Sequence, residues 1–187
     1  MPGKLIVISG PSGVGKSTIA KRLVERLDGQ VSISATTRPK GNQEEDGRDY
    51  HFVSPQQFQR MIQAGDLLEW ARYLGNYYGT PRKPVAKALR QGRDVLLEIE
   101  VEGGKQVAKS FPDAIMIYLL PPDDAELRRR LEQRSRDEPA EIDRRFANAK
   151  REIEQARESQ VYKHWIINSD VEAAVDEIVN IVKAGVA

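Results

Sequence analysis

The chain has 187 residues, and its 29 lysines and arginines nearly balance its 28 aspartates and glutamates, which leaves a formal net charge of +1. This length suits a single domain with a small insertion and can bury a sizeable core. The balanced charge predicts no nucleic-acid partner and no membrane surface, and the absence of cysteine excludes disulfides and thiolate metal sites.

The N-terminal apolar stretch predicts a core strand. Residues 5–8 are apolar and predict a strand over 5–9, and a glycine-rich segment follows where a signal peptide would have a small-residue cleavage site. No apolar run approaches the roughly 20 residues that a membrane span needs. We therefore expect a cytoplasmic protein.

A glycine-rich loop follows this first strand. Apolar residues at helical spacing predict a helix over residues 16–27, directly after the loop. The intervening segment fits the pattern G-x-x-x-x-G-K-[ST], which is the phosphate loop of many nucleotide-binding proteins. Its residues are Gly10, Pro11, Ser12, Gly13, Val14, Gly15, Lys16, Ser17 and Thr18.

This loop predicts a site for ATP with Mg²⁺. A turn between a strand and a helix directs backbone N–H groups at one point, and the helix N-terminus adds positive potential there. The amine of Lys16 reaches the β- and γ-phosphates, and the hydroxyl of Ser17 can hold Mg²⁺.

The next part of the chain predicts short strands around one helix. Alternating residues at 31–35 predict a strand, and the polar residues 36–49 predict a loop. Ser54 and Pro55 predict a helix start, because serine can cap the helix and proline at the first position needs no N–H. Further short strands are expected at 50–53, 67–73 and 77–80.

From residue 94 the chain returns to a regular alternation of apolar strands and helices. The expected strands cover 94–99, 115–120 and 165–168, and the expected helices cover 104–110, 123 or 124 to about 134, 139–160 and 171–184. Strands that alternate with helices predict a parallel sheet covered on both faces. The segment from about 32 to 84 breaks this alternation and predicts an insertion over the phosphate loop.

Three further motifs follow the phosphate loop. S-x-TTR runs from Ser34 to Arg38, and GNYYGT follows Glu69 and ends at Thr80. Arginines then recur on two charged helices as L-x-x-R-L-x-x-R and I-x-x-R. With these motifs, essentially the whole chain resembles the guanylate kinases, enzymes that phosphorylate GMP with ATP.

The resemblance implies that Ser34, Glu69 and Thr80 bind the guanine base. Guanine carries two adjacent donors, N1–H and N2–H, which one carboxylate can accept together. Adenine has an acceptor at N1 and no amine at C2, so Glu69 would face a lone pair. A site built on such hydrogen bonds can reject the wrong base by about 10⁴-fold or more.

The resemblance also implies that Arg38, Tyr50 and Tyr78 bind the phosphate of GMP. The planar guanidinium of arginine suits bidentate contacts with phosphate. The tyrosine hydroxyls donate hydrogen bonds without adding charge.

Two departures from the family pattern concern this part of the site. Gly41 stands where the family commonly has a second phosphate-binding arginine, and Lys40 and Arg48 are the neighbours that could replace it. Glu98 and Glu100 stand where the family usually has aspartates. We expect Glu100 on the GMP side, whereas Glu98 either orients water on Mg²⁺ or is an ordinary strand-end residue.

Catalysis is expected from Lys16, Arg130, Arg134 and Arg145, which would surround the transferring phosphoryl group. Arg130 and Arg134 lie at i and i+4, on one face of a helix. Positioning and charge neutralisation suffice for phosphoryl transfer without a covalent intermediate. Ser135 replaces the family's glycine after Arg134. The remaining arginines of this region are expected on a solvated face: Arg128, Arg129, Arg136 and Arg144.

The implied fold is α/β, a P-loop three-layer α/β/α core with a parallel sheet, a small mixed α/β GMP-binding insertion and a helical lid. The core would comprise residues 1–32, 85–122 and 160–187. The insertion would comprise residues 33–84 and the lid residues 123–159.

The implied activity is transfer of the γ-phosphoryl group of ATP to GMP, and to dGMP, by a monomer or homodimer. A non-catalytic guanylate-kinase-like protein-binding module is one alternative, but such modules degrade the phosphate loop, which is intact here. A kinase for another small phosphate acceptor is favoured weakly by Gly41 and opposed by Glu69 with GNYYGT.

Overall fold

The structure is a computed structural model that describes residues 2–73, 75–134 and 138–185, without the side chain of Arg134. Its elements in chain order are β1 (Leu5–Ser9), α1 (Lys16–Leu27), β2 (Gln30–Val31), β3 (Ala35–Thr36), β4 (His51–Phe52), α2 (Pro55–Gln63), β5 (Leu67–Tyr73), β6 (Asn76–Pro81), α3 (Arg82–Arg90), β7 (Val95–Glu98), α4 (Val101–Ser110), β8 (Ile115–Leu120), α5 (Asp124–Arg134), α6 (Pro139–Ser159), β9 (His164–Ile167) and α7 (Val171–Ala184).

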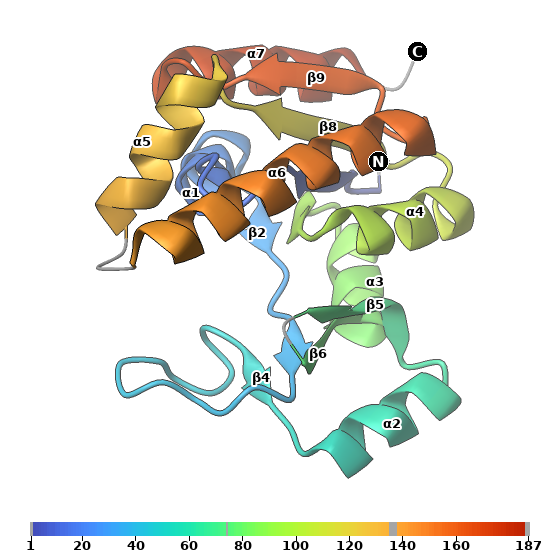
Figure 1. Ribbon diagram of the computed structural model, residues 1–187. Helices are drawn as coiled ribbons and strands as arrows, with labels where there is room; N and C mark the ends of the chain where they lie inside the picture. Colours follow the sequence, from blue (N-terminus) through green and yellow to red (C-terminus); the bar gives the residue numbers. More distant parts are fainter. Residues whose placement is uncertain (1, 74, 135–137, 186–187) are drawn as a thin grey trace.

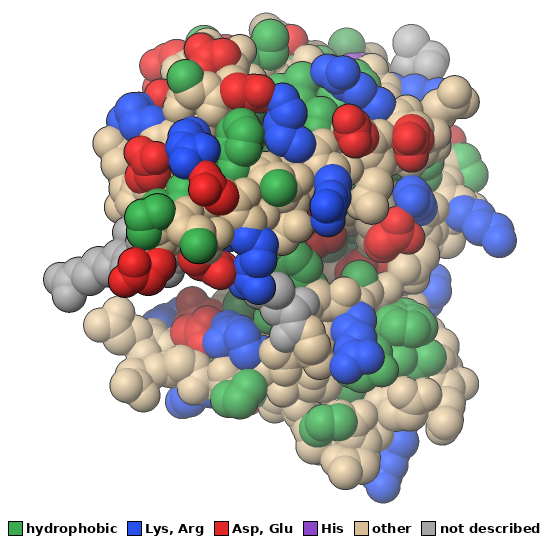
Figure 2. All heavy atoms as spheres, viewed as in Figure 1, with side chains coloured by type: hydrophobic (Ala, Val, Ile, Leu, Met, Phe, Trp, Pro, Cys, Tyr) green, Lys and Arg blue, Asp and Glu red, His purple; other side chains and the backbone are tan. Residues whose placement is uncertain are grey.

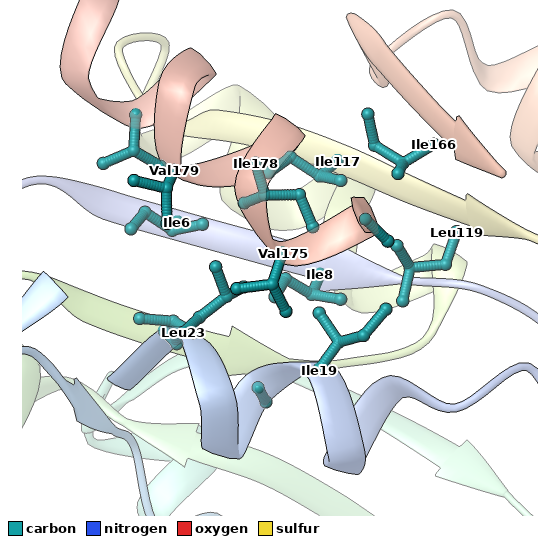
Figure 3. Close-up of a cluster of buried hydrophobic side chains, with 14 of the residues drawn as sticks. Ile6, Ile8, Ile19, Leu23, Ile117, Leu119, Ile166, Val175, Ile178 and Val179 are labelled. Atoms are coloured by element: carbon teal, nitrogen blue, oxygen red, sulfur yellow. The ribbon is translucent and has the colours of Figure 1, made fainter. Parts of the chain in front are cut away.

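The core is a parallel sheet of five strands in the order β2-β7-β1-β8-β9. Side chains alternate across its pleat. Ile6 and Ile8 pack with α1 and α7 on one face (Figure 3), whereas Leu5 and Val7 pack with α3, α4 and α6 on the other. The prediction of a parallel sheet covered on both faces is confirmed.

A second, mixed sheet has the strand order β4-β3-β6-β5 and lies with α2 at the opposite end of the molecule from α7 (Figure 1). Helix α2 begins as predicted, with Ser54 and Gln57 capping each other's backbone N–H groups. The buried core of this part is small and consists of Ala35, Phe58 and Leu67.

The predicted strand at 31–35 is wrong, because the structure divides this segment between the two sheets. Ser32 N–H donates to Leu96 of the core sheet, whereas His51 N–H donates to Ser34 O in the second sheet. The alternation of side chains is the same in both parts, so it could not reveal that the hydrogen-bonding partners change. Helix α3 was not predicted, because Pro84 in its first turn resembles a loop residue, and α4 begins at Val101 rather than at residue 104.

Helices α5 and α6 pack together, and α6 crosses in front of α1 in the view of Figure 1. Their shared core contains Leu127, Leu131 and Ala149. A Cβ atom on Gly13 would lie 3.0 Å from Leu131 Cδ2, so glycine permits the loop and α5 to approach closely. No helix in the described residues is long and apolar enough to cross a membrane.

Candidate functional site

The phosphate loop follows β1 at the carboxyl edge of the parallel sheet, where α/β folds place their ligands. Gly13 and Gly15 adopt φ values of 87° and 102°, which favour glycine. A Cβ atom on Gly15 would also lie 2.7 Å from Asn168 Nδ2. The amine of Lys16 donates to the carbonyl of Gly10, and its Nζ lies 3.5 Å from Glu100 Oε1.

Ser17 and Glu98 bring two oxygen atoms together at this edge of the sheet. The hydroxyl of Ser17 donates to Glu98 Oε1 at 2.6 Å. A hydroxyl and a carboxylate are ligands that suit Mg²⁺, an ion that usually binds few protein groups together with substrate phosphates. The residues present therefore fit a magnesium ion, and Glu98 lies next to Ser17, the residue that the sequence predicts as a ligand of this ion.

A cavity of about 530 Å³ lies between the carboxyl edge of the core sheet and the second sheet. Figure 2 shows the hollow between these two parts of the molecule, with acidic side chains inside it. The cavity brings together many of the predicted residues from both parts: Lys16, Ser17, Ser34, Tyr50, Glu69, Tyr78, Glu98 and Glu100.

Glu69 and Thr80 form a buried pair at the far wall of this cavity. They are partners in the β5–β6 register, and Thr80 Oγ1 donates to Glu69 Oε1 at 2.7 Å. Gly103 of α4 lets the carboxylate approach, because a Cβ atom there would lie 2.3 Å from Glu69 Oε2. Glu69 is only 4% exposed, and this burial raises the pKa of its carboxyl to about 7, although the hydrogen bonds from Thr80 oppose the shift.

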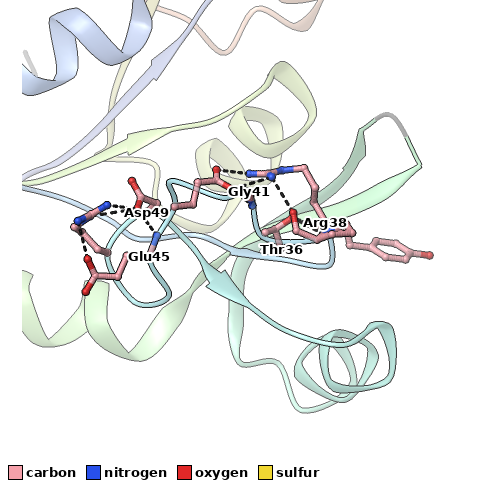
Figure 4. A network of polar contacts seen from close by, with 9 residues as sticks. Thr36, Arg38, Gly41, Glu45 and Asp49 are labelled. Carbon is pink, nitrogen blue, oxygen red and sulfur yellow. Dashed lines mark hydrogen bonds and ion pairs between the residues drawn. The ribbon is translucent and has the colours of Figure 1, made fainter.

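Arg38 is held by Glu44, a residue that the sequence did not single out as a partner. Its two terminal nitrogens donate to the two carboxylate oxygens of Glu44 at 2.9 and 2.6 Å (Figure 4). Gly41 N–H donates to the same carboxylate at 2.7 Å, and together these contacts lower the pKa of Glu44. The Arg38 guanidinium also lies over the Tyr50 ring, with Cζ 5.4 Å from the ring centroid.

The two candidate replacements for the missing arginine differ in their surroundings. Arg48 lines the cavity, but its guanidinium bonds to Glu45 and Asp49 within its own loop. Lys40 is exposed. Gly41 itself has no left-handed backbone conformation, although a Cβ atom there would lie 2.9 Å from Glu44 Oε2.

The lid arginines lie in different places. Arg145 Nη2 donates to Ser12 Oγ at 3.4 Å. Arg130 instead lines a second cavity and donates to the carbonyls of Val14 and Asn168 at 3.2 and 2.9 Å. The side chain of Arg134 lies outside the described residues.

The other basic residues of these helices are mainly a solvated face. Arg128 and Arg144 are exposed and pair with Asp143 and Glu141. Arg129 is also exposed, although it borders the second cavity. Arg136 and Ser135 lie outside the described residues.

Sequence reasoning missed the second cavity, which has a volume of about 380 Å³ and adjoins the phosphate loop. Asn168 is its most buried polar residue, at 2% exposure. Its Nδ2 donates to Val14 O at 2.7 Å, and its Oδ1 has no hydrogen-bond partner among the described residues. The available signal was a polar residue at the carboxyl end of the last parallel strand.

Comparisons with known proteins agree on one family. The family model described as guanylate kinase matches residues 2–185. A guanylate kinase of Thermosynechococcus vestitus is 49% identical over 93% of this chain and 90% of its own length. One from Enterococcus faecalis is 48% identical over 96% of this chain and 88% of its own. The crystal structure of guanylate kinase from Anaplasma phagocytophilum matches with a TM-score of 0.78 and 32% identity, covering 98% of this chain and 86% of that one.

Proposed function

The chain belongs to the guanylate kinase family, and we propose that it transfers the γ-phosphoryl group of ATP to GMP, giving ADP and GDP. One observation carries the proposal. Lys16 and Ser17 of the phosphate loop line the same cavity as Glu69, the residue suited to guanine. Donor and acceptor can therefore meet within a single space, as an in-line transfer requires.

The donor triphosphate would bind on the phosphate loop. The amine of Lys16 would leave Gly10 and contact the β- and γ-phosphates. Arg145 already contacts Ser12 in the loop and could neutralise charge on the transferring group. The second cavity, which adjoins the phosphate loop, offers space for the rest of the nucleotide.

Ser17 and Glu98 would hold Mg²⁺, whose charge offsets that of the phosphates when it is bound. The adjacency of the two side chains, at 2.6 Å, supports this assignment. It also favours the metal-side role for Glu98, one of two roles that the sequence left open.

The acceptor would bind in the second sheet. Glu69 in its ionised form can accept N1–H and N2–H of guanine, while Thr80 and Ser34 complete the base site. The GMP phosphate would approach Arg38 beside the hydroxyl groups of Tyr50 and Tyr78, whose rings pack edge to face with their centroids 6.1 Å apart. That phosphate carries the same kind of charge as the Glu44 carboxylate, so it would compete with Glu44 for the guanidinium.

We further propose that residues 33–84 act as the GMP-binding insertion and residues 123–159 as the lid. Closure of both over the cavity would exclude water, so that the phosphoryl group passes to GMP instead of being hydrolysed. The enzyme would act in the cytoplasm, as a monomer or homodimer, with ATP and GMP as its small-molecule partners.

A coupled assay of ADP release tests this function. GMP, dGMP, AMP, CMP and UMP are compared as acceptors with ATP and Mg²⁺. We expect turnover with GMP and dGMP and little with the others, because only guanine presents two donors to Glu69. Equal turnover of AMP and GMP would contradict the base assignment, and binding of GMP without any turnover would favour a non-catalytic module.

A further inference from the structure

Ser12 of the phosphate loop is held by two side chains of opposite charge from α6. Arg145 and Glu152 are seven positions apart, or about two helical turns, so they lie on the same face of the helix. Arg145 Nη2 donates to Ser12 Oγ at 3.4 Å, and Ser12 N–H donates to Glu152 Oε2 at 3.3 Å. A carboxylate thus accepts a hydrogen bond from an N–H group of a loop built to bind phosphate.

The charges around Glu152 show which ligand its carboxylate resembles. Burial and the negative charge of Glu100 raise its pKa, while Lys16 and the Ser12 N–H oppose the shift. Lys16 therefore lies within reach of two carboxylates, because Glu100 is 3.5 Å from its amine. Among the described residues, Tyr73 of β5 and Tyr118 of β8 also face Glu152, and both are neutral phenols whose pKa values its charge helps to raise.

We propose that Glu152 is a positioning residue that sets the affinity of the phosphate loop for the triphosphate. Its carboxylate occupies the Ser12 N–H and adds a second negative charge near Lys16. A triphosphate must therefore displace this carboxylate or bind against its charge. The inference rests on the proposed function, because it assumes that the loop binds the phosphates of the donor.

A residue with this role would speed turnover by helping the product nucleotide to leave. Backbone N–H groups, a helix N-terminus and a lysine together bind phosphates strongly, and a product that binds too well leaves slowly. An internal carboxylate lowers the affinity for donor and product alike. It also returns to the Ser12 N–H when the nucleotide leaves.

Calorimetric titration of Mg²⁺–ATP into the full-length protein without GMP tests the proposal. Glu152→Gln removes the charge but keeps an oxygen that can accept the Ser12 N–H. Glu152→Ala removes both. Glu154→Gln removes the same charge from an exposed position two residues along α6 and serves as the matched control.

We expect Glu152→Gln to bind ATP about 5-fold more tightly at low salt, and the gain to shrink at high salt because it comes from removal of a like charge. KM for ATP should fall, while KM for GMP stays within about twofold, since the donor site alone gains affinity. Glu152→Ala should gain less than Glu152→Gln, because it no longer holds Ser12 in place. Glu154→Gln should match the wild type.

Unchanged or weaker ATP binding by Glu152→Gln would overturn the inference, as would an equal gain in Glu154→Gln. The wild-type titration distinguishes an error in the proposed function from an error in the role of Glu152. If the wild type fails to bind ATP, the proposed function is wrong. If the wild type binds ATP and the Gln variant binds it equally, only the role of Glu152 is wrong.

Discussion

The two walls of the main cavity are built in different ways. On the donor wall the phosphate loop presents backbone N–H groups and rests on a large core, in which Val14 and Ile19 are fully buried. On the acceptor wall the candidate residues are side chains of a thin sheet, whose own cluster of buried apolar residues in the described structure is small and contains Ala35, Phe58 and Leu67. Their positions depend on polar contacts, such as the fork between Arg38 and Glu44 and the bond between Thr80 and Glu69.

This contrast separates two kinds of mutational effect. Loop geometry comes from glycines and the packing beneath them, so donor-wall side chains can be removed with little effect on the fold. Acceptor-wall side chains hold one another in place, so changes there should alter affinity and stability together. The following predictions test this contrast.

Lys16→Ala should have the largest effect and test the donor wall. The lysine amine contacts the loop carbonyl of Gly10 and Glu100, not the apolar core. Turnover should fall by at least about 100-fold, because a preorganised positive charge is lost from the phosphates. The thermal melt should stay close to that of the wild type. Near-normal turnover, or a large fall in the melting temperature, would contradict the difference between the two walls.

Arg145→Ala should lower kcat by roughly 10- to 100-fold with a smaller change in KM for GMP, because the charge it meets develops during transfer. Arg134→Ala is expected to behave alike. Arg128→Ala is the control, since that exposed arginine pairs with acids of the lid helices and lies over the Phe146 ring. Steady-state kinetics distinguish them, and equal losses at all three positions would indicate a general basic field.

The buried Glu69 should make GMP binding depend on pH. Its pKa of about 7 means that the free protein carries a largely neutral carboxyl at pH 6, whereas the forked contact with guanine requires the ionised form. GMP binding should weaken by about tenfold from pH 8 to pH 6. The Glu69→Gln variant should bind GMP more weakly at every pH. Because the GMP phosphate titrates in the experiments on both proteins, the variant gives the part of the pH dependence that does not come from Glu69.

The same carboxyl should affect stability with the opposite sign. A carboxyl whose folded-state pKa is raised stabilises the neutral form, and this contribution is lost as pH rises through about 7. The loss begins near the unfolded-state pKa of about 4.5 and is complete a little above 7, so relative to Glu69→Gln the wild type should lose about 1.4 kcal/mol of unfolding free energy between pH 6 and pH 8.5. Denaturant melts of both proteins at pH 6 and pH 8.5 measure the difference. A parallel response of the two would show that Glu69 stays ionised in the fold.

Gly41→Arg should have the smallest effect. The backbone there is not left-handed, so arginine brings no strain of that kind, although its Cβ would lie 2.9 Å from Glu44 Oε2 and the carboxylate would have to shift. An added cation should tighten GMP binding by about threefold, mainly through KM. Calorimetry and a thermal melt are the measurements. Weaker binding with a lower melt would mean that the network around Glu44 has no room for a side chain.

Local sequence patterns predicted the donor wall better than the acceptor wall. The phosphate loop is contiguous, and the continuous apolar run at residues 5–8 correctly indicated a strand buried on both faces. Asn168 and Glu152 could not be found in this way, because each reaches the loop from more than 130 positions away. The roles of the individual site residues stay predictions.

The break in the strand at residues 32–34 has a consequence for how this fold can diversify. The second sheet is inserted in the sequence between β2 and β7, which are neighbours in the core sheet. It connects to the core sheet through residues 32–34 on one side and through α3 on the other, and the loop-bearing strand β1 pairs with β7 and β8 of the core sheet. The second sheet is therefore a separate inserted unit. Exchange of this insertion could change the acceptor substrate while the core sheet and its phosphate loop are retained.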